Sequence, residues 1–300
     1  MDMTQNKCCR HGASLRRRRR RRRKILRSII FSCSIIAVAV FVAVGSSMIR
    51  SGDGRTNRYD VEAGNNTYDN AVIENSKISE KNKIQNNQSM LDDIMNSTQY
   101  PKQLKDLALK NEEALEFVYD YPAEHVKEHT IDLTEEASMD SVPLFVQWDK
   151  RWGYEKYSGN FFAASGCGPT TLSMVVVYLT HNREASPIAV AKYSKEAGYS
   201  VDGSGSSWTL ISEGCRHYGV KAKTVALDES RMKAELDEGH PIVVNVGPGD
   251  FTDTGHFMVI TGYDDEGFSI NDPNSIEKSG KRWLFKNISS QIRAVWSMYV

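Results

Sequence analysis

The chain has 300 residues, an ordinary apolar content of 40% and a formal net charge of zero, which together predict about two folded units. Its charge is unevenly distributed. Residues 1–27 carry 12 basic residues and one acidic residue, whereas the remainder carries 26 basic and 37 acidic residues, a net charge of −11. This acidic balance argues against nucleic-acid binding by the main body of the chain.

The N-terminal segment predicts a membrane anchor. Arg16–Arg23 is an unbroken run of arginines, and it precedes Ser28–Ile49, which contains no charged residue. As a helix, this apolar run would be about 33 Å long, enough to cross a bilayer. The positive-inside rule then predicts a basic cytoplasmic tail over 1–27, a transmembrane anchor over 28–49 and an extracellular remainder. A cleaved signal peptide is the alternative, with Ala43-Val44-Gly45 as the small-residue cleavage site, and it also exports the chain.

The next two segments differ in composition. Ser51–Ser89 is polar and has no apolar period, so residues 50–99 are predicted to form a polar linker or stalk. Residues 100–141 are predicted to form a helical extension. Its apolar residues follow helical spacing from Tyr100 to Tyr121, with Pro101 near the start and Pro122 past the end. We expect this helix to pack against the domain that follows.

His125, Glu128 and His129 form an H-x-x-E-H pattern, which occurs on the zinc-binding helix of some metallopeptidases. Two histidines four residues apart share a helix face, and the glutamate would serve as the base. The segment has no apolar stripe and no evident third ligand. A solvated polar turn is therefore favoured over a zinc site.

Residues 142–300 alternate short apolar runs with turn residues. Helices are predicted over 186–198, 207–219 and 228–239. Strands are predicted over 220–227, 241–246, 256–263, 268–272, 281–285 and 294–300, with a hairpin turn at residues 264–267. Helices followed by a run of antiparallel strands define an α+β fold.

Cys167 is the candidate nucleophile. It lies between Gly166 and Gly168 and directly precedes the apolar stripe of a predicted helix, with Pro169 in the first turn. Free N–H groups and the macrodipole at a helix N-terminus favour a thiolate, which is the nucleophilic form. The alternative is a small buried cysteine that opens an ordinary helix.

The other cysteines suggest no metal site. Cys8, Cys9 and Cys33 lie in or before the apolar N-terminal run, and no CxxC pair or zinc-ligand spacing exists. Cys215 is predicted to be buried and non-catalytic. The sequence does not exclude a disulfide bond between Cys167 and Cys215.

His256 is the predicted base, because it begins an apolar strand and the other histidines lie in less suitable places. Asp272 or Asn271 ends the next strand, where either could accept the ring N–H of His256, although these residues also suit a turn. Gln147 is the predicted side-chain donor to an oxyanion, beside the N–H of Cys167. A surface amide between packed tryptophans is its alternative interpretation.

Four motifs in this order resemble the stand-alone branch of the double-glycine (bacteriocin-leader) peptidases, which are papain-like cysteine peptidases. They are Gln147 in QWDKRWGY, Cys167 in SGCGPTTLSM, His256 in GHFMVITGY and Asp272 in NDPNS. The resemblance covers about residues 142–300. It implies a papain-like fold, with helices carrying the cysteine packed on an antiparallel sheet carrying the histidine and aspartate. The preceding helix with FVYDYP resembles an extension found in Gram-positive bacterial members.

The sequence therefore predicts a membrane-anchored, extracytoplasmic cysteine peptidase that acts on a peptide or protein and requires no metal or cofactor. The best-known members of the family are fused to an ATP-binding-cassette exporter, but this chain has no Walker motif, so leader processing does not transfer to it. Two alternatives remain: a peptidoglycan endopeptidase or amidase with the same thiol chemistry, and a non-enzymatic surface binding module. Several further residues are expected to line the cleft or to belong to the core and loops: Trp148, Trp152, Trp208, Phe251 and Gly203–Ser206.

Overall fold

The structure is a computed structural model that describes residues 66–300, of which residues 70–300 belong to one compact unit. The predicted cytoplasmic tail over 1–27 and membrane anchor over 28–49 lie outside the described residues. Among the helices that the structure describes, none is both long enough and apolar enough to span a bilayer.

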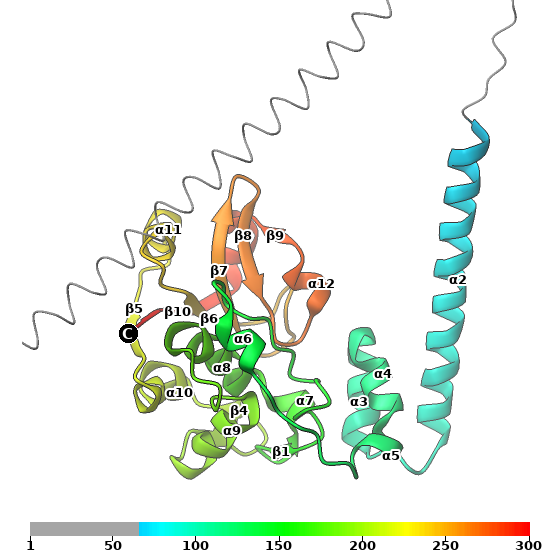
Figure 1. The fold of residues 1–300 in the computed structure, drawn as a ribbon, viewed down its shortest axis with the longest axis horizontal. Helices are drawn as coiled ribbons and strands as arrows, with labels where there is room; N and C mark the ends of the chain where they lie inside the picture. The colour runs from blue at the N-terminus through cyan, green and yellow to red at the C-terminus, as the bar shows by residue number, and fades with distance from the viewer. Residues whose placement is uncertain (1–65) are drawn as a thin grey trace, which may run out of the picture. The chain divides into compact units, whose positions relative to one another are not determined.

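Helix α2 (Asn66–Asn96) occupies much of the segment predicted to be a polar linker (Figure 1). From residue 79 to residue 89 its side chains are mostly exposed, as expected for a polar helix without an apolar stripe. Its last turns differ. Ile94 is fully buried, and Met90 and Leu91 pack against the same apolar cluster.

The extension consists of several short helices, so the prediction of one continuous helix over 100–121 is wrong. Asn111 has an extended backbone (φ −136°, ψ 99°), which ends one helix, and its side chain accepts a hydrogen bond from the N–H of Glu113 and so caps the next. The helices are α3 (Lys102–Lys110), η1 (Glu112–Ala114), α4 (Leu115–Tyr119), α5 (Tyr121–Glu124) and α6 (Thr134–Ser138).

The H-x-x-E-H segment follows α5 and is not helical. The ring of His125 stacks on that of Tyr121 at a centroid distance of 4.1 Å, and His129 lies 3.7 Å from a carboxylate oxygen of Glu124. No group of three or more potential metal-binding residues (His, Cys, Asp or Glu) occurs within the described part of the chain. The helical geometry on which the zinc alternative depends is absent from this segment.

Most of the helices predicted after residue 142 are present. The exception is the helix over 207–219, which is split at Glu213 because the backbone leaves helical geometry there (φ −126°). The helices are α7 (Phe162–Ser165), α8 (Cys167–Thr180), α9 (Pro187–Glu196), α10 (Thr209–Ser212), η2 (Gly214–Tyr218), α11 (Glu229–Asp237), α12 (Ile276–Ser279), α13 (Phe285–Ile288) and η3 (Ser289–Gln291).

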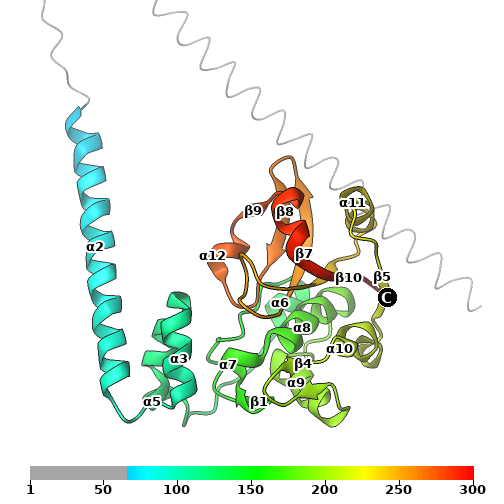
Figure 2. The same ribbon diagram turned by 180° about the vertical axis from the view of Figure 1, so that it is seen from behind.

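A six-stranded antiparallel sheet follows the first helices and confirms the predicted α+β class. Its order is β5-β10-β6-β7-β8-β9, so the hairpin β7–β8 lies beside the central strand β6 (Figures 1 and 2). The strands are β5 (Lys221–Thr224), β6 (Ile242–Val246), β7 (His256–Asp264), β8 (Gly267–Asn271), β9 (Arg282–Trp283) and β10 (Ile292–Tyr299). Two small hairpins precede this sheet: β1 (Lys156–Tyr157) with β2 (Asn160–Phe161), and β3 (Ser200–Val201) with β4 (Gly205–Ser206).

Apolar cores on the two faces of the sheet explain why its central strands are apolar along their whole length. Phe257 and Val259 of β7 belong to the cluster formed with α8 and α9, whereas Met258 and Ile260 belong to the cluster formed with α11 and α13. Successive side chains of a strand point to opposite faces, so both faces of β7 are covered. Burial of this kind stabilises the sheet by about 25 cal/mol per Å² of apolar surface.

Helix α8 is held in a defined position on β7. Thr171, one turn into the helix, donates a hydrogen bond of 3.1 Å to the carbonyl oxygen of Phe257, which follows His256. At the start of the helix, a Cβ on Gly168 would lie only 2.5 Å from the hydroxyl oxygen of Ser206, so glycine allows the hairpin β3–β4 to approach closely. These contacts fix the helix start against both the sheet and the hairpin.

Candidate active site

Cys167 is the first residue of α8, as the glycine–proline pattern predicts. Its N-cap, Gly166, has no side chain, so it cannot cap the first N–H groups of the helix. Cys167 forms no disulfide bond, and it is partly buried. Cys215 is also a free cysteine but is fully buried in the core beside α8, so the disulfide left open by the sequence is not formed.

His256 begins β7, and its Nε2 lies 2.7 Å from Oδ1 of Asp272, directly after β8. Both side chains are buried: His256 is 6% exposed and Asp272 is 0% exposed. Asn271 does not take this position. Its amide instead donates to the carbonyl oxygens of Val142 and Pro143 at 3.2 and 3.0 Å.

The second ring nitrogen of His256 is therefore the one available to Cys167, and the pKa values of the two groups depend on one another. Burial on its own raises the pKa of the thiol. The hydrogen bond and charge of His256 and the N–H groups of Phe257 and Gly168 outweigh burial, so the pKa of Cys167 lies below its ordinary value.

The same coupling acts on the ring in the opposite direction. Burial disfavours the imidazolium and lowers the pKa of His256, but the charge and hydrogen bond of Asp272, together with Cys167, raise it well above its ordinary value. A lowered thiol pKa and a raised imidazole pKa favour the thiolate–imidazolium pair, which is the reactive form of a cysteine nucleophile.

Gln147 is buried rather than on the surface, with 5% of its area exposed. Its Nε2 donates one hydrogen bond to the carbonyl oxygen of Ala163 at 2.7 Å, and the second amide hydrogen has no partner among the described residues. Its backbone N–H donates to the carbonyl oxygen of Pro273 at 2.7 Å. The segment of Gln147 is thus attached both to the chain before Cys167 and to the loop after Asp272.

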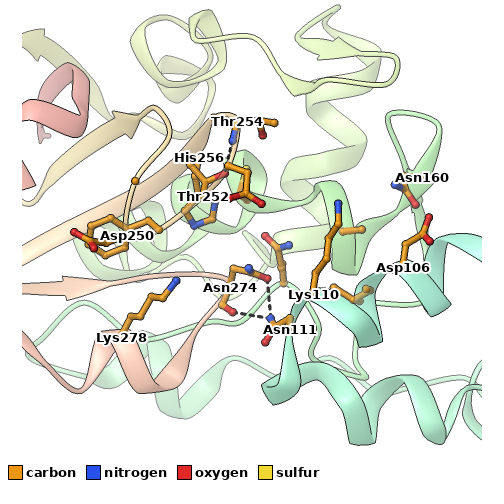
Figure 3. A pocket seen from close by; sticks show the side chains of 18 of the residues that line it. Asp106, Lys110, Asn111, Asn160, Asp250, Thr252, Thr254, His256, Asn274 and Lys278 are labelled. Carbon is orange, nitrogen blue, oxygen red and sulfur yellow. Dashed lines mark hydrogen bonds between the residues drawn. The ribbon is translucent and has the colours of Figure 1, made fainter. Parts of the chain in front are cut away.

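Two pockets meet at Cys167. The first, of about 510 Å³, is lined by Cys167, His256 and Gln147 together with polar residues of α3 and of the loop 249–255 (Figure 3). The second, of about 710 Å³, is lined by Cys167, Trp208 and the hairpin residues Gly203–Ser206. Cys167 therefore lies between the two halves of one cleft.

The aromatic residues proposed for the cleft separate into two groups. Phe251 lines the first pocket and Trp208, which is 47% exposed, lines the second, whereas Trp152 is buried in the core and Trp148 packs on the extension. The sequence interpretation missed the contribution of α3, whose Gln103, Asp106, Lys110 and Asn111 line the first pocket. An asparagine followed by two glutamates at residues 111–113 is a helix-start signal that could have shown where α3 ends.

These features define a domain of the thiol-peptidase kind, and comparison with known families agrees. The model of the "Peptidase_C39 like family" matches residues 139–300, more than half of the chain. The chain belongs to this family, and the suspected resemblance to the bacteriocin-leader peptidases is confirmed at the level of the family.

Two solved structures resemble part of the chain. The peptidase domain of Streptococcus ComA, a bi-functional ABC transporter involved in a quorum sensing pathway, is 19% identical over 53% of this chain and 96% of that domain, with a TM-score of 0.39. A protein from Bacillus anthracis described as a C39-like peptidase is 17% identical over 53% of this chain and 95% of its own, with a TM-score of 0.33. No curated protein sequence matches the chain.

Proposed function

We propose that this chain is a membrane-anchored, extracytoplasmic cysteine peptidase that hydrolyses peptide bonds through Cys167, His256 and Asp272. The observation that carries the proposal is the coupling of three side chains at one cleft. Cys167 at the start of α8 lines the same pocket as His256, which lowers the thiol pKa and lies 2.7 Å from the buried carboxylate of Asp272. Membership of the family supports a peptide or protein as the substrate.

In the proposed reaction, the thiolate of Cys167 attacks the carbonyl carbon of the peptide bond while the imidazolium of His256 holds the proton. The carbonyl oxygen becomes an oxyanion, to which the free amide hydrogen of Gln147 and the N–H of Cys167 donate. His256 then gives its proton to the amide nitrogen, the C–N bond breaks and the amine leaves. Water, deprotonated by His256, attacks the thioester, releases the acid and regenerates the thiol.

The two halves of the cleft receive different parts of the substrate. His256 lines the pocket of about 510 Å³ and does not line the other. Because His256 protonates the leaving amine, the peptide segment after the scissile bond occupies the pocket beside His256. We call this the leaving-group pocket. The segment that becomes the thioester occupies the pocket beside Trp208.

The test of the proposal is incubation of the purified full-length chain with a complex mixture of peptides, followed by mass spectrometry of the new N-termini. The control is the same protein alkylated beforehand with iodoacetamide. New termini that appear only with unmodified protein support the peptidase. Cleavage of peptidoglycan peptides alone would favour the wall-directed alternative, and the absence of any cleavage would favour a binding module.

Gln147→Ala is expected to lower kcat by about 10²–10³-fold, the usual effect of removing one oxyanion donor. The loss falls on kcat because the amide bonds the oxyanion more strongly than the ground-state carbonyl. Gln88→Ala is the matched control, since Gln88 is exposed and its side chain bonds only Asp92 on the same helix. A Gln147→Ala variant with unchanged kcat would contradict the assigned role.

The membrane anchor is tested separately. The apolar, uncharged run Ser28–Ile49 beside the arginine run is expected to keep the full-length chain in the membrane fraction after extraction with alkaline carbonate. Mass spectrometry of the mature N-terminus distinguishes an intact anchor from cleavage near Gly45. Release of an uncleaved chain by carbonate would refute the anchor without affecting the proposed chemistry.

A further inference from the structure

The residues before the family-matched region contribute to the candidate active site. Helix α3 and residue Asn111, which follows it, line the leaving-group pocket together with Cys167 and His256. The extension is also continuous with the segment that precedes the nucleophile. Phe161 and Ala163 are buried in the same apolar cluster as the extension residues Leu104, Leu107, Ala114, Leu115, Phe117 and Val118. The extension is therefore packed against the catalytic domain at its cleft.

The loop after β8 carries the catalytic carboxylate. Oδ1 of Asp272, which faces His256, also accepts a hydrogen bond of 2.8 Å from the backbone N–H of Asn274. The other carboxylate oxygen, Oδ2, is buried without a hydrogen-bond partner among the described residues. The direction in which Asp272 presents Oδ1 to His256 therefore depends on where the backbone of Asn274 lies.

Two residues of the extension bind the loop after β8 and the helix α12 that follows it. Nδ2 of Asn111 donates to the carbonyl oxygen of Asn274 at 2.9 Å and to its Oδ1 at 3.1 Å, and Figure 3 shows the two side chains facing one another. The carboxylate of Glu113 accepts hydrogen bonds from the hydroxyl of Ser275 and from the backbone N–H groups of Ile276 (2.7 Å) and Glu277 (3.1 Å).

Asn111 and Glu113 are themselves parts of one turn. Oδ1 of Asn111 accepts the N–H of Glu113 at 3.0 Å, and the next two residues, Ala114 and Leu115, are buried in the core of the extension. The amide of Asn111 and the carboxylate of Glu113, which bind the loop, are thus held by a turn that is packed into an apolar core. Such support is what keeps a catalytic group within the narrow range of productive geometry.

We propose that Glu113 and Asn111 are positioning residues for Asp272, and that the extension is a functional part of the peptidase. The chain of contacts runs from Asn111 to Asn274, from Asn274 to Asp272, and from Asp272 to His256 and Cys167. Neither extension residue contacts the reacting atoms. The inference rests on the proposed function, because it assigns these residues a role in the same Cys–His–Asp chemistry.

Loss of either contact is expected to loosen the bond between Asp272 and His256. The imidazolium then loses part of its stabilisation, and the thiolate of Cys167 loses its charged partner. We expect Glu113→Ala and Asn111→Ala each to lower hydrolysis by about 10–100-fold. This is the range measured for residues that orient the ligands of a catalytic metal, which act on the site in the same indirect way. The pH at which Cys167 becomes reactive is expected to rise at the same time, which a purely structural role does not cause.

The test measures the rate of Cys167 alkylation against pH, read by mass spectrometry, in the full-length chain and its variants. Glu112→Ala is the matched control. It removes the neighbouring carboxylate of the same helix, which instead accepts a hydrogen bond from Asn87. Glu113→Asp keeps the acceptor and is expected to recover part of the wild-type profile. Circular dichroism and melting temperature report whether each variant is folded.

A raised pH of activation in Glu113→Ala and Asn111→Ala, with a wild-type profile in Glu112→Ala, supports the proposal. Wild-type profiles in both folded variants overturn it. If Glu113→Ala is unfolded, the uncharged Asn111→Ser decides, since serine still offers a helix-capping oxygen but lacks the amide that donates to Asn274. The proposed function fails by a different result, namely wild-type Cys167 that reacts only above about pH 8.5, the ordinary thiol value.

Discussion

Cys167→Ala is expected to reduce peptide hydrolysis by the full-length chain to the uncatalysed background, a loss of about 10⁴-fold or more. The variant removes the sulfur atom that forms the thioester, and nothing else in the cleft replaces it. Cys215 is the other cysteine of the described domain, and it is buried in the core. The measurement is the appearance of new N-termini in a peptide mixture.

Cys215→Ala is the matched control for this loss. Burial raises the pKa of Cys215 to about 11, so its thiol is neither exposed nor ionised at neutral pH. We expect Cys215→Ala to retain hydrolysis and to lower only the free energy of unfolding, because it leaves a small cavity beside α8. Cleavage that survived Cys167→Ala but not Cys215→Ala would contradict the choice of nucleophile.

His256→Ala is expected to slow alkylation of Cys167 at pH 7 by at least about tenfold, the change that one pKa unit makes in the thiolate fraction. In the wild-type chain the lowered thiol pKa places the rise in reactivity below the ordinary thiol value. The variant removes the hydrogen bond and the charge that lower the pKa. Burial remains, so the thiol pKa rises and the reactive window moves to higher pH.

Hydrolysis by the wild-type chain is expected to extend over a broad pH window, because Cys167 and His256 shift each other's pKa in opposite directions. The lowered pKa of Cys167 sets its acidic limit, and the raised pKa of His256 sets its alkaline limit, above which the leaving amine receives no proton. Asp272→Asn removes the charge that raises the pKa of His256, so the alkaline limit is expected to fall. His240→Ala is the control, because the ring of His240 bonds Glu235 and does not line the cleft. The coupling would be contradicted if His256→Ala left the pH dependence of Cys167 alkylation unchanged and Asp272→Asn left the pH dependence of hydrolysis unchanged.

The positions of the candidate site residues were largely predictable from local patterns. Glycine and proline around Cys167 marked the start of α8, and the apolar run after His256 marked the start of β7. A hairpin with a short turn necessarily brings the start of its first strand close to the end of its second. Asp272 was therefore expected near His256, as the structure places it.

The sequence could not show whether Asn271 or Asp272 faces His256, because both residues are polar and both lie at the end of the same strand. Adjacent residues of a strand point to opposite sides, so only one of them could face His256. A shift of one residue in the end of β8 would have exchanged their roles. The structure settles their placement through register, with Asn271 opposite Val259 and Asp272 beyond the strand.

The contribution of the extension was unpredictable for a different reason. The contacts of Asn111 and Glu113 with the loop after Asp272 join residues more than 160 positions apart in the chain. Helical periodicity reports only neighbours within a few turns, and it also concealed the break at Asn111. These distant residues are brought together by tertiary packing, in which the extension shares an apolar cluster with Phe161 and Ala163.

The position of β10 bears on when the sheet that carries His256 can be completed. It follows all the other strands of the sheet in chain order, yet it lies between β5 and β6 and pairs with both. Until residues 292–299 have been synthesised, β6 has an open edge and the apolar clusters on both faces lack Val295, Trp296 and Met298. A sheet joined by such distant pairings also forms slowly. The nascent chain can thus make α8 and the β7–β8 hairpin well before it can complete the sheet that supports them. The site residues therefore reach their final arrangement only after residues 292–299 have joined the sheet.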